Sequence, residues 1–104
     1  MDEIVILITT PSKKEGEKIG HYLVENRLAA CANILPKITS IFSWEGKIHK
    51  DSESLLILKT KRSLFQQVAE EVKKRHSYTV PEIIAIPLVE GSAPYLEWIQ
   101  KNTL

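Results

Sequence analysis

A turn signal at Glu45 and Gly46 separates two long runs of residues that both favour the β-strand. Residues 29 to 44 show no helical period and end in the β-branched and aromatic segment ITSIFSW, while Pro36 predicts an edge, a bulge or a bend. Residues 47 to 61 run back and contain the apolar stretch LLIL. Gly adopts the positive φ that tight hairpins need. Two strands of about fourteen residues would make a hairpin roughly 46 Å long.

Shorter apolar runs lie on either side of this hairpin. Residues 3 to 9 and 83 to 89 are expected to be short buried strands. The order strand, helix, strand, strand, helix, strand, helix predicts an α+β fold of the ferredoxin-like split βαβ type (βαββαβ), with a long central hairpin and an added C-terminal helix. The length suits one domain over residues 1–104.

The predicted helices have start signals. Ser12 with Glu15, and Ser63 with Gln66, have the spacing of a capping box, and an apolar stripe at helical spacing follows each pair. Ser92 is expected to cap the last helix. These signals support the three helices of the predicted order.

Charge and composition argue against several classes of partner. The chain has 14 Lys and Arg against 13 Asp and Glu, so its charge favours neither nucleic acid nor an anionic membrane. The N-terminal stretch MDEIVILITT is too short to span a bilayer and begins with acids, unlike a secretory signal. Cys31 is the only cysteine, which suits a reducing compartment. We therefore expect a cytoplasmic protein with no nucleic-acid or membrane partner.

The long hairpin also predicts self-association. The outer strands, about seven residues each, would span roughly 23 Å and leave the hairpin tip uncovered. That tip carries Ile41, Phe42, Trp44 and Ile48. Exposed apolar side chains and open strand edges are normally covered, and a second copy of the chain is the simplest cover. The alternative is a shorter hairpin with a bent, irregular tip.

The segment RHSYTVPEI, residues 75 to 83, concentrates polar side chains in a short connection. Imidazole and carboxylate are metal ligands, so His76 and Glu82 are candidates for a metal site, and Tyr78 with Glu82 for a polar ligand. Pro81 restrains the preceding backbone. The alternative is structural: His76 meets the C-terminus of a helix and Tyr78 packs on the core.

Three further residues have both a structural and a functional interpretation. Cys31 is either a small buried residue or a soft metal ligand or redox-sensitive thiol. Trp44 would wall a ligand cleft or, as we favour, anchor a subunit contact. Lys59 would bind an anion or neutralise Glu82, or else lie at the rim of the sheet. No nucleophile, base and electrophile occur together, so we do not expect an enzyme.

Four segments, in this order, resemble the CutA1 divalent-cation tolerance proteins from end to end. They are LAACANI (28 to 34), SWEGKIHKDSE (43 to 53), LILKTKRSLF (56 to 65) and HSYTVPEIIAIPLVEGSAPYLEWI (76 to 99). The resemblance implies a ferredoxin-like homotrimer whose long hairpins pack between subunits, and a role in tolerance of copper and other divalent ions. It also implies a likeness in shape to the PII signalling proteins, which bind ligands in clefts between subunits.

The resemblance and the candidate residues lead to two hypotheses about ligands. The first is Cu(II) or another divalent cation, with no tightly bound cofactor, on the metal ligands Cys31, His76 and Glu82. The alternative is a PII-like signalling or scaffold module that binds a small anionic ligand in an intersubunit cleft lined by Trp44, Lys59, Tyr78 and Glu82. The expected subunit interface contains Phe42, Trp44, Glu45 and Gly46.

One departure from the family pattern weakens the metal hypothesis. Ser77 and Thr79 stand where the family usually has proline and glutamate. Loss of that acid removes one oxygen ligand from the segment.

Overall fold

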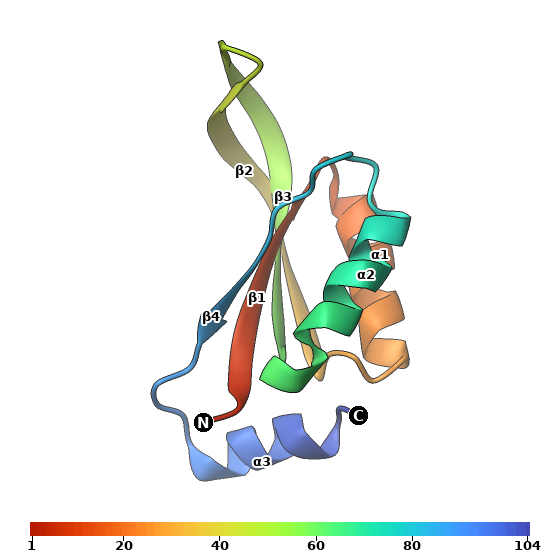
Figure 1. The fold of residues 1–104 in the computed structure, drawn as a ribbon, viewed down its shortest axis with the longest axis vertical. Coiled ribbons are helices and arrows are strands. Elements are labelled where there is room, and N and C mark those ends of the chain that lie inside the picture. The colour runs from red at the N-terminus through yellow and green to blue at the C-terminus, as the bar shows by residue number, and fades with distance from the viewer.

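The structure, a computed structural model, describes residues 1–104 and contains one antiparallel sheet of four strands in the order β2-β3-β1-β4 (Figure 1). Its elements are β1 (Glu3–Thr10), α1 (Lys13–Glu25), β2 (Cys31–Trp44), β3 (Lys47–Lys61), the short 3₁₀ helix η1 (Arg62–Leu64), α2 (Phe65–Arg75), β4 (Ile83–Pro87) and α3 (Ala93–Lys101). This order confirms the predicted α+β, ferredoxin-like fold with an added C-terminal helix. None of the helices is long and apolar enough to cross a membrane.

The central hairpin is as long as the sequence predicts. Its turn places Glu45 at φ 51° and Gly46 at φ 76°, the positive values of a tight hairpin turn. Pairing of β3 with β1 ends at Ser54, so residues 47–53 of β3 pair with β2 alone. The predicted irregularity at Pro36 is also present, because the β2–β3 register shifts between Leu35 and Ile38. The hairpin tip consequently extends well beyond the other two strands (Figure 1).

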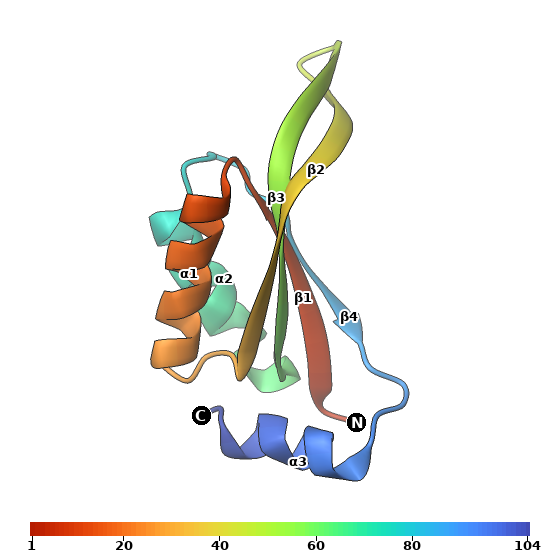
Figure 2. The ribbon, with the colours of Figure 1, turned by 180° about the vertical axis from the view of Figure 1, so that it is seen from behind.

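The core lies between one face of the sheet and the helices α1 and α2, which cover that face (Figures 1 and 2). Alternate residues of the central strands point into it, as the pleat requires. The fully buried set includes Ile6, Ile8, Leu56, Leu58, Ile19, Leu23, Val68 and Val72. Each such side chain stabilises the fold by about 1.5–3 kcal/mol through burial.

The opposite face of the sheet is open, which corrects the expectation that residues 3–9 and 83–89 are fully buried strands. The helix side of β1 is fully buried, whereas Val5, Leu7 and Thr9 on its other side are partly exposed. The edge strand β4 ends at Pro87 and is mostly exposed, with Ile84 at 50% and Ile86 at 48%. The physical reason is that one chain supplies helices for one face only. The third helix, α3, crosses the end of the sheet away from the hairpin tip (Figure 2).

The capping predictions had mixed outcomes. Ser12 caps α1 by accepting a hydrogen bond from the Glu15 N–H at 3.2 Å. The second capping box is wrong, because η1 contains Ser63 and α2 begins after Leu64 without a side-chain cap. Ser92 is the N-cap residue of α3, but its side chain makes no capping hydrogen bond.

Candidate functional site

The structure separates the predicted site residues into three places. Trp44, Tyr78 and Glu82 line one cleft. His76 lies buried next to this cleft and supports it. Cys31 and Lys59 lie opposite each other, at the start of β2 and near the end of β3, and Cys31 is next to Tyr95 of α3.

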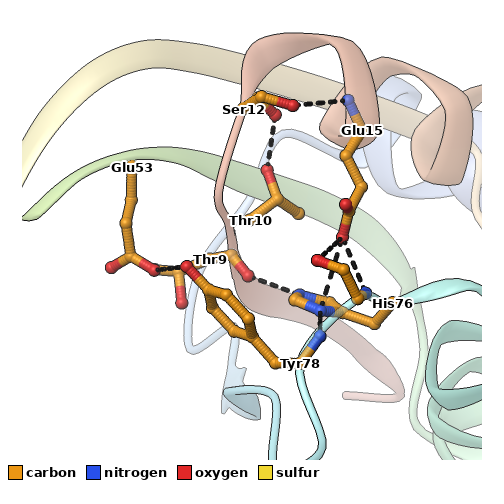
Figure 3. Close-up of polar contacts among 8 residues, drawn as sticks. Thr9, Thr10, Ser12, Glu15, Glu53, His76 and Tyr78 are labelled. Atoms are coloured by element: carbon orange, nitrogen blue, oxygen red, sulfur yellow. Dashed lines mark hydrogen bonds and ion pairs between the residues drawn. The ribbon is translucent and has the colours of Figure 1, made fainter.

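His76 holds the α2–β4 connection against β1 (Figure 3). Its Nε2 is 2.7 Å from the Thr9 carbonyl oxygen, and its Nδ1 is 3.1 Å from the Tyr78 backbone nitrogen. A carbonyl only accepts and a backbone N–H only donates, so Nε2 carries the hydrogen and Nδ1 accepts. Both ring nitrogens are therefore engaged within the subunit, but with β1 and the connection itself, whereas the sequence interpretation placed the imidazole at the end of α2. Only the backbone N–H of His76 caps that helix.

Glu15 fastens the same connection to α1. One carboxylate oxygen accepts hydrogen bonds from the Ser77 N–H at 3.0 Å and the Ser77 hydroxyl at 3.1 Å, and it lies 3.5 Å from Nδ1 of His76 (Figure 3). The departure from the family pattern at Ser77 thus supplies a hydroxyl that binds Glu15. The segment is anchored at both β1 and α1, which gives Tyr78 a defined position.

Tyr78 joins this connection to β3. Its hydroxyl donates a 2.7 Å hydrogen bond to Oε2 of Glu53 (Figure 3). Burial raises the pKa of Tyr78 above its ordinary value, and the Glu53 carboxylate raises it further. The phenol therefore stays protonated at neutral pH and acts as a donor.

The cleft itself has a volume of about 570 Å³ and lies where β3 leaves β1 and the hairpin begins to overhang. It is lined by three carboxylates, three aromatic rings and no lysine or arginine. The lining residues are Thr9, Ser40, Ile41, Phe42, Trp44, Asp51, Glu53, Tyr78, Thr79, Val80 and Glu82. This arrangement favours a cationic ligand over an anionic one.

Asp51 and Glu53 were not among the predicted site residues, although the sequence contains a signal for them. They are two positions apart on a strand and so share a face, and Asp51 pairs with Ser40 across the hairpin. Alternation along β3 places both acids on the side opposite the helices, together with Thr9 of β1.

Lys59 lies outside the cleft. Its ammonium hydrogen-bonds to the Asn33 side chain and lies 4.0 Å from the Cys31 sulfur, and no ion pair joins it to Glu82. Tyr95 of α3 is close as well, since burial and the neighbouring Cys31 raise the pKa of that phenol. A cation beside the Cys31 sulfur disfavours a divalent ion there.

The predicted metal ligands do not form one site within a subunit. No group of three or more His, Cys, Asp or Glu side chains in the chain is arranged to hold a metal ion. Cys31 is separated from Glu82, and both ring nitrogens of His76 are occupied. Of the predicted interface residues, Phe42 and Trp44 are 38% and 46% exposed, and Glu45 and Gly46 form the exposed turn.

Comparison with known proteins covers nearly the whole chain. The sequence profile of the CutA1 divalent ion tolerance proteins matches residues 4–102. The chain is 50% identical over 101 residues to the divalent-cation tolerance protein CutA of Thermus thermophilus, covering 97% of this chain and 98% of that one. It is 47% identical over 100 residues to the chloroplastic CutA of Arabidopsis thaliana, covering 96% of this chain but only 55% of the plant protein.

Solved structures agree with these sequence matches. The Thermus thermophilus divalent cation tolerance protein superposes with a TM-score of 0.95 at 50% identity, over 97% of this chain and 98% of that one. The Oryza sativa CutA1 structure gives 0.96 at 43% identity, over 100% and 95% of the two chains. The periplasmic divalent cation tolerance protein CutA of Archaeoglobus fulgidus gives 0.93 at 47% identity, over 96% and 97%. The chain therefore belongs to the CutA1 divalent ion tolerance protein family.

Proposed function

We propose that the protein serves in divalent-cation tolerance by binding Cu(II) and similar divalent ions as a homotrimer, at the cleft between the hairpin and the α2–β4 connection. One observation carries the location: Asp51, Glu53 and Glu82 line this cleft and no basic side chain does. The names of the relatives, divalent-cation tolerance proteins, supply the class of ligand.

The ligand chemistry favours carboxylate oxygens. Within one subunit the cleft acids do not form a complete coordination group, so water or a neighbouring subunit would supply the remaining ligands. Among divalent first-row ions, Cu(II) has the highest affinity for a given oxygen or nitrogen site. That Cys31 and His76 bind the ion stays a prediction from the sequence. The geometry favours Glu82, Asp51 and Glu53 as the ligands of the ion.

The open face of the sheet supports self-association. Alternation and strand pairing place apolar side chains on the face that no helix covers, namely Val5, Leu7, Leu35, Leu55, Ile57, Ile84 and Ile86. The hairpin tip adds the exposed Ile41 and Ile48. Surfaces of this kind mark an interface between proteins. The resemblance to the CutA1 family implies three subunits. The predicted interface contains Phe42, Trp44, Glu45 and Gly46, and it would place the cleft at a subunit boundary.

The alternative, a small anionic ligand in this cleft, lacks the basic side chain that would bind it. Lys59, the only basic residue in the set predicted for that cleft, contacts Cys31 and Asn33 instead. We further propose a binding role rather than catalysis, in line with the description of the family. The cytoplasmic location also stays a prediction, since the names of relatives include a chloroplastic and a periplasmic protein.

Calorimetric titration of Cu(II) into tag-free protein tests this proposal. We expect saturable binding at a fixed ratio per subunit, weakened about tenfold by Glu82→Gln or Asp51→Asn, because each removes one carboxylate. Both side chains are exposed, so the variants should fold. Glu97→Gln on α3, outside the cleft, is the matched control and should bind like wild type. Binding that neither cleft variant changes would place the ion elsewhere.

A further inference from the structure

The cleft contains a second chemical feature that a hydrated metal ion does not use. Phe42, Trp44 and Tyr78 line it together with the three carboxylates. Phe42 and Trp44 are two positions apart on β2 and so lie on the same side of that strand, whereas Tyr78 comes from the α2–β4 connection. Phe42 is held by stacking on His49, with ring centroids 5.4 Å apart. Divalent ions bind oxygen, nitrogen or sulfur ligands, so these rings indicate a ligand with apolar surface.

Glu53 has one oxygen without a partner. The residue is only 7% exposed, and its one side-chain hydrogen bond comes from Tyr78 to Oε2. No lysine, arginine or histidine forms an ion pair with it. Every fully buried polar side-chain atom in the subunit has a partner, so the unbonded Oε1 is not fully buried, and Glu53 lines the cleft. Figure 3 shows this oxygen pointing away from Tyr78.

A largely buried carboxylate without a cation is unfavourable unless a ligand supplies the charge. The nearest cations along the strands are Lys37, which precedes Ile38, the partner of Glu53, and Lys50, which precedes Asp51. Neither lines the cleft. Aromatic rings attract ammonium groups through their negative faces. The negative charge of the cleft and its aromatic side chains therefore both favour an ammonium ligand.

We infer that this cleft binds a small organic cation, an alkylammonium whose charged head lies beside Glu53 and Asp51 and whose alkyl groups contact Trp44, Phe42 and Tyr78. The volume of about 570 Å³ is in the range of small-molecule sites. The inference is independent of divalent-ion binding. It is drawn from the aromatic rings and the carboxylates of the cleft, and neither needs a bound metal ion.

A matched pair of probes tests it on the intact protein. Calorimetry in buffer with EDTA would compare 3,3-dimethylbutylammonium with 3,3-dimethyl-1-butanol, which keeps the alkyl group and lacks the charge. We expect saturable binding of the ammonium and at least about tenfold weaker binding of the alcohol. Because EDTA removes divalent ions, the result is independent of the proposed metal binding. Equal affinity for the two probes would show a merely apolar groove and overturn the inference, as would no saturable binding of the ammonium, for instance because a neighbouring subunit fills the cleft.

Variants locate the site. Glu53→Gln keeps an acceptor for Tyr78 and removes the charge, and Trp44→Leu removes an aromatic wall. Each should weaken ammonium binding about tenfold, while Trp44→Phe should retain most of it. Asp51→Asn, at an exposed position, provides a second charge test if Glu53→Gln does not fold. Glu97→Gln is again the control. Wild-type affinity in Asp51→Asn and Trp44→Leu together would contradict the inference.

Discussion

The Tyr78 hydroxyl lies 2.7 Å from Oε2 of Glu53 and donates a hydrogen bond to it, joining the α2–β4 connection to the middle of β3. These two residues are 25 positions apart, and their contact forms one wall of the cleft. The hydrogen bond orients the carboxylate and leaves its second oxygen without a hydrogen-bond partner. The contact therefore contributes both to the fold and to the proposed ligand site.

Tyr78→Phe should reduce the free energy of unfolding by about 1–2 kcal/mol, because Glu53 loses its only hydrogen bond in a largely buried position. Urea denaturation followed by circular dichroism measures this change. Ser43→Ala, at an exposed position of β2 outside the cleft, serves as a control, for which we expect less than about 0.5 kcal/mol. Equal losses in the two variants would show that the Glu53 contact contributes little.

The contribution of Tyr78 to the free energy of unfolding should also depend on pH. Its pKa is raised in the folded state above the ordinary value of about 10, chiefly by burial and then by Glu53. A raised pKa contributes stability that is fully present below the unfolded pKa and is lost as pH rises toward the folded pKa. The stability difference between wild type and Tyr78→Phe should thus be constant below about pH 10 and shrink above it. Denaturation curves at several pH values between 7 and 11 would test this, and a difference that grows above pH 10 would contradict it.

His76→Ala should be among the more destabilising single substitutions outside the apolar core. It leaves the Thr9 carbonyl and the Tyr78 N–H without partners in a buried setting, which we expect to lower the free energy of unfolding by about 2–4 kcal/mol. His21→Ala, at an exposed position of α1, should change it by less than about 0.5 kcal/mol. Thermal and urea denaturation of both variants would measure these changes. A loss of stability in His76→Ala no larger than in His21→Ala would argue against the structural role of His76.

Self-association should depend on the open face of the sheet. Light scattering should give a mass near three times the 11.8 kDa of one chain. Ile86→Glu places a charge on the apolar face of β4 and should dissociate the assembly, whereas Lys73→Glu on the exposed side of α2 should leave the mass unchanged. A wild-type protein that stays monomeric at high concentration would refute the trimer.

The sequence predicted the fold well where local signals are strong. The turn at Glu45 and Gly46 and the order of the elements follow from local conformation and hydrophobic period. The exposure of β4 did not follow, since an apolar strand such as residues 83 to 87 looks the same in sequence whether its own chain or another copy covers it. The cap at Ser63 also failed, because a 3₁₀ turn placed the start of α2 one residue after Leu64.

The candidate site was predicted less completely, because its residues depend on strand register. Register places Lys59 opposite Cys31 rather than near Glu82, and it places Asp51 opposite Ser40 beside the cleft. The role of His76 depends on the Thr9 carbonyl, 67 positions away, and no local pattern shows that contact. Tyr78 and Glu82, by contrast, were identified from their own segment and share the cleft with Trp44.

Electron paramagnetic resonance of the protein with one equivalent of Cu(II) per subunit tests the central claim most directly, namely that the cleft carboxylates hold the ion. The account predicts a spectrum of oxygen ligation that shifts toward aqueous Cu(II) in Glu82→Gln and is the same in wild type, His76→Gln and Cys31→Ser. Nitrogen couplings that disappear in His76→Gln, or a thiolate absorption band that disappears in Cys31→Ser, would contradict the account and assign the ion to the ligands first indicated by the sequence.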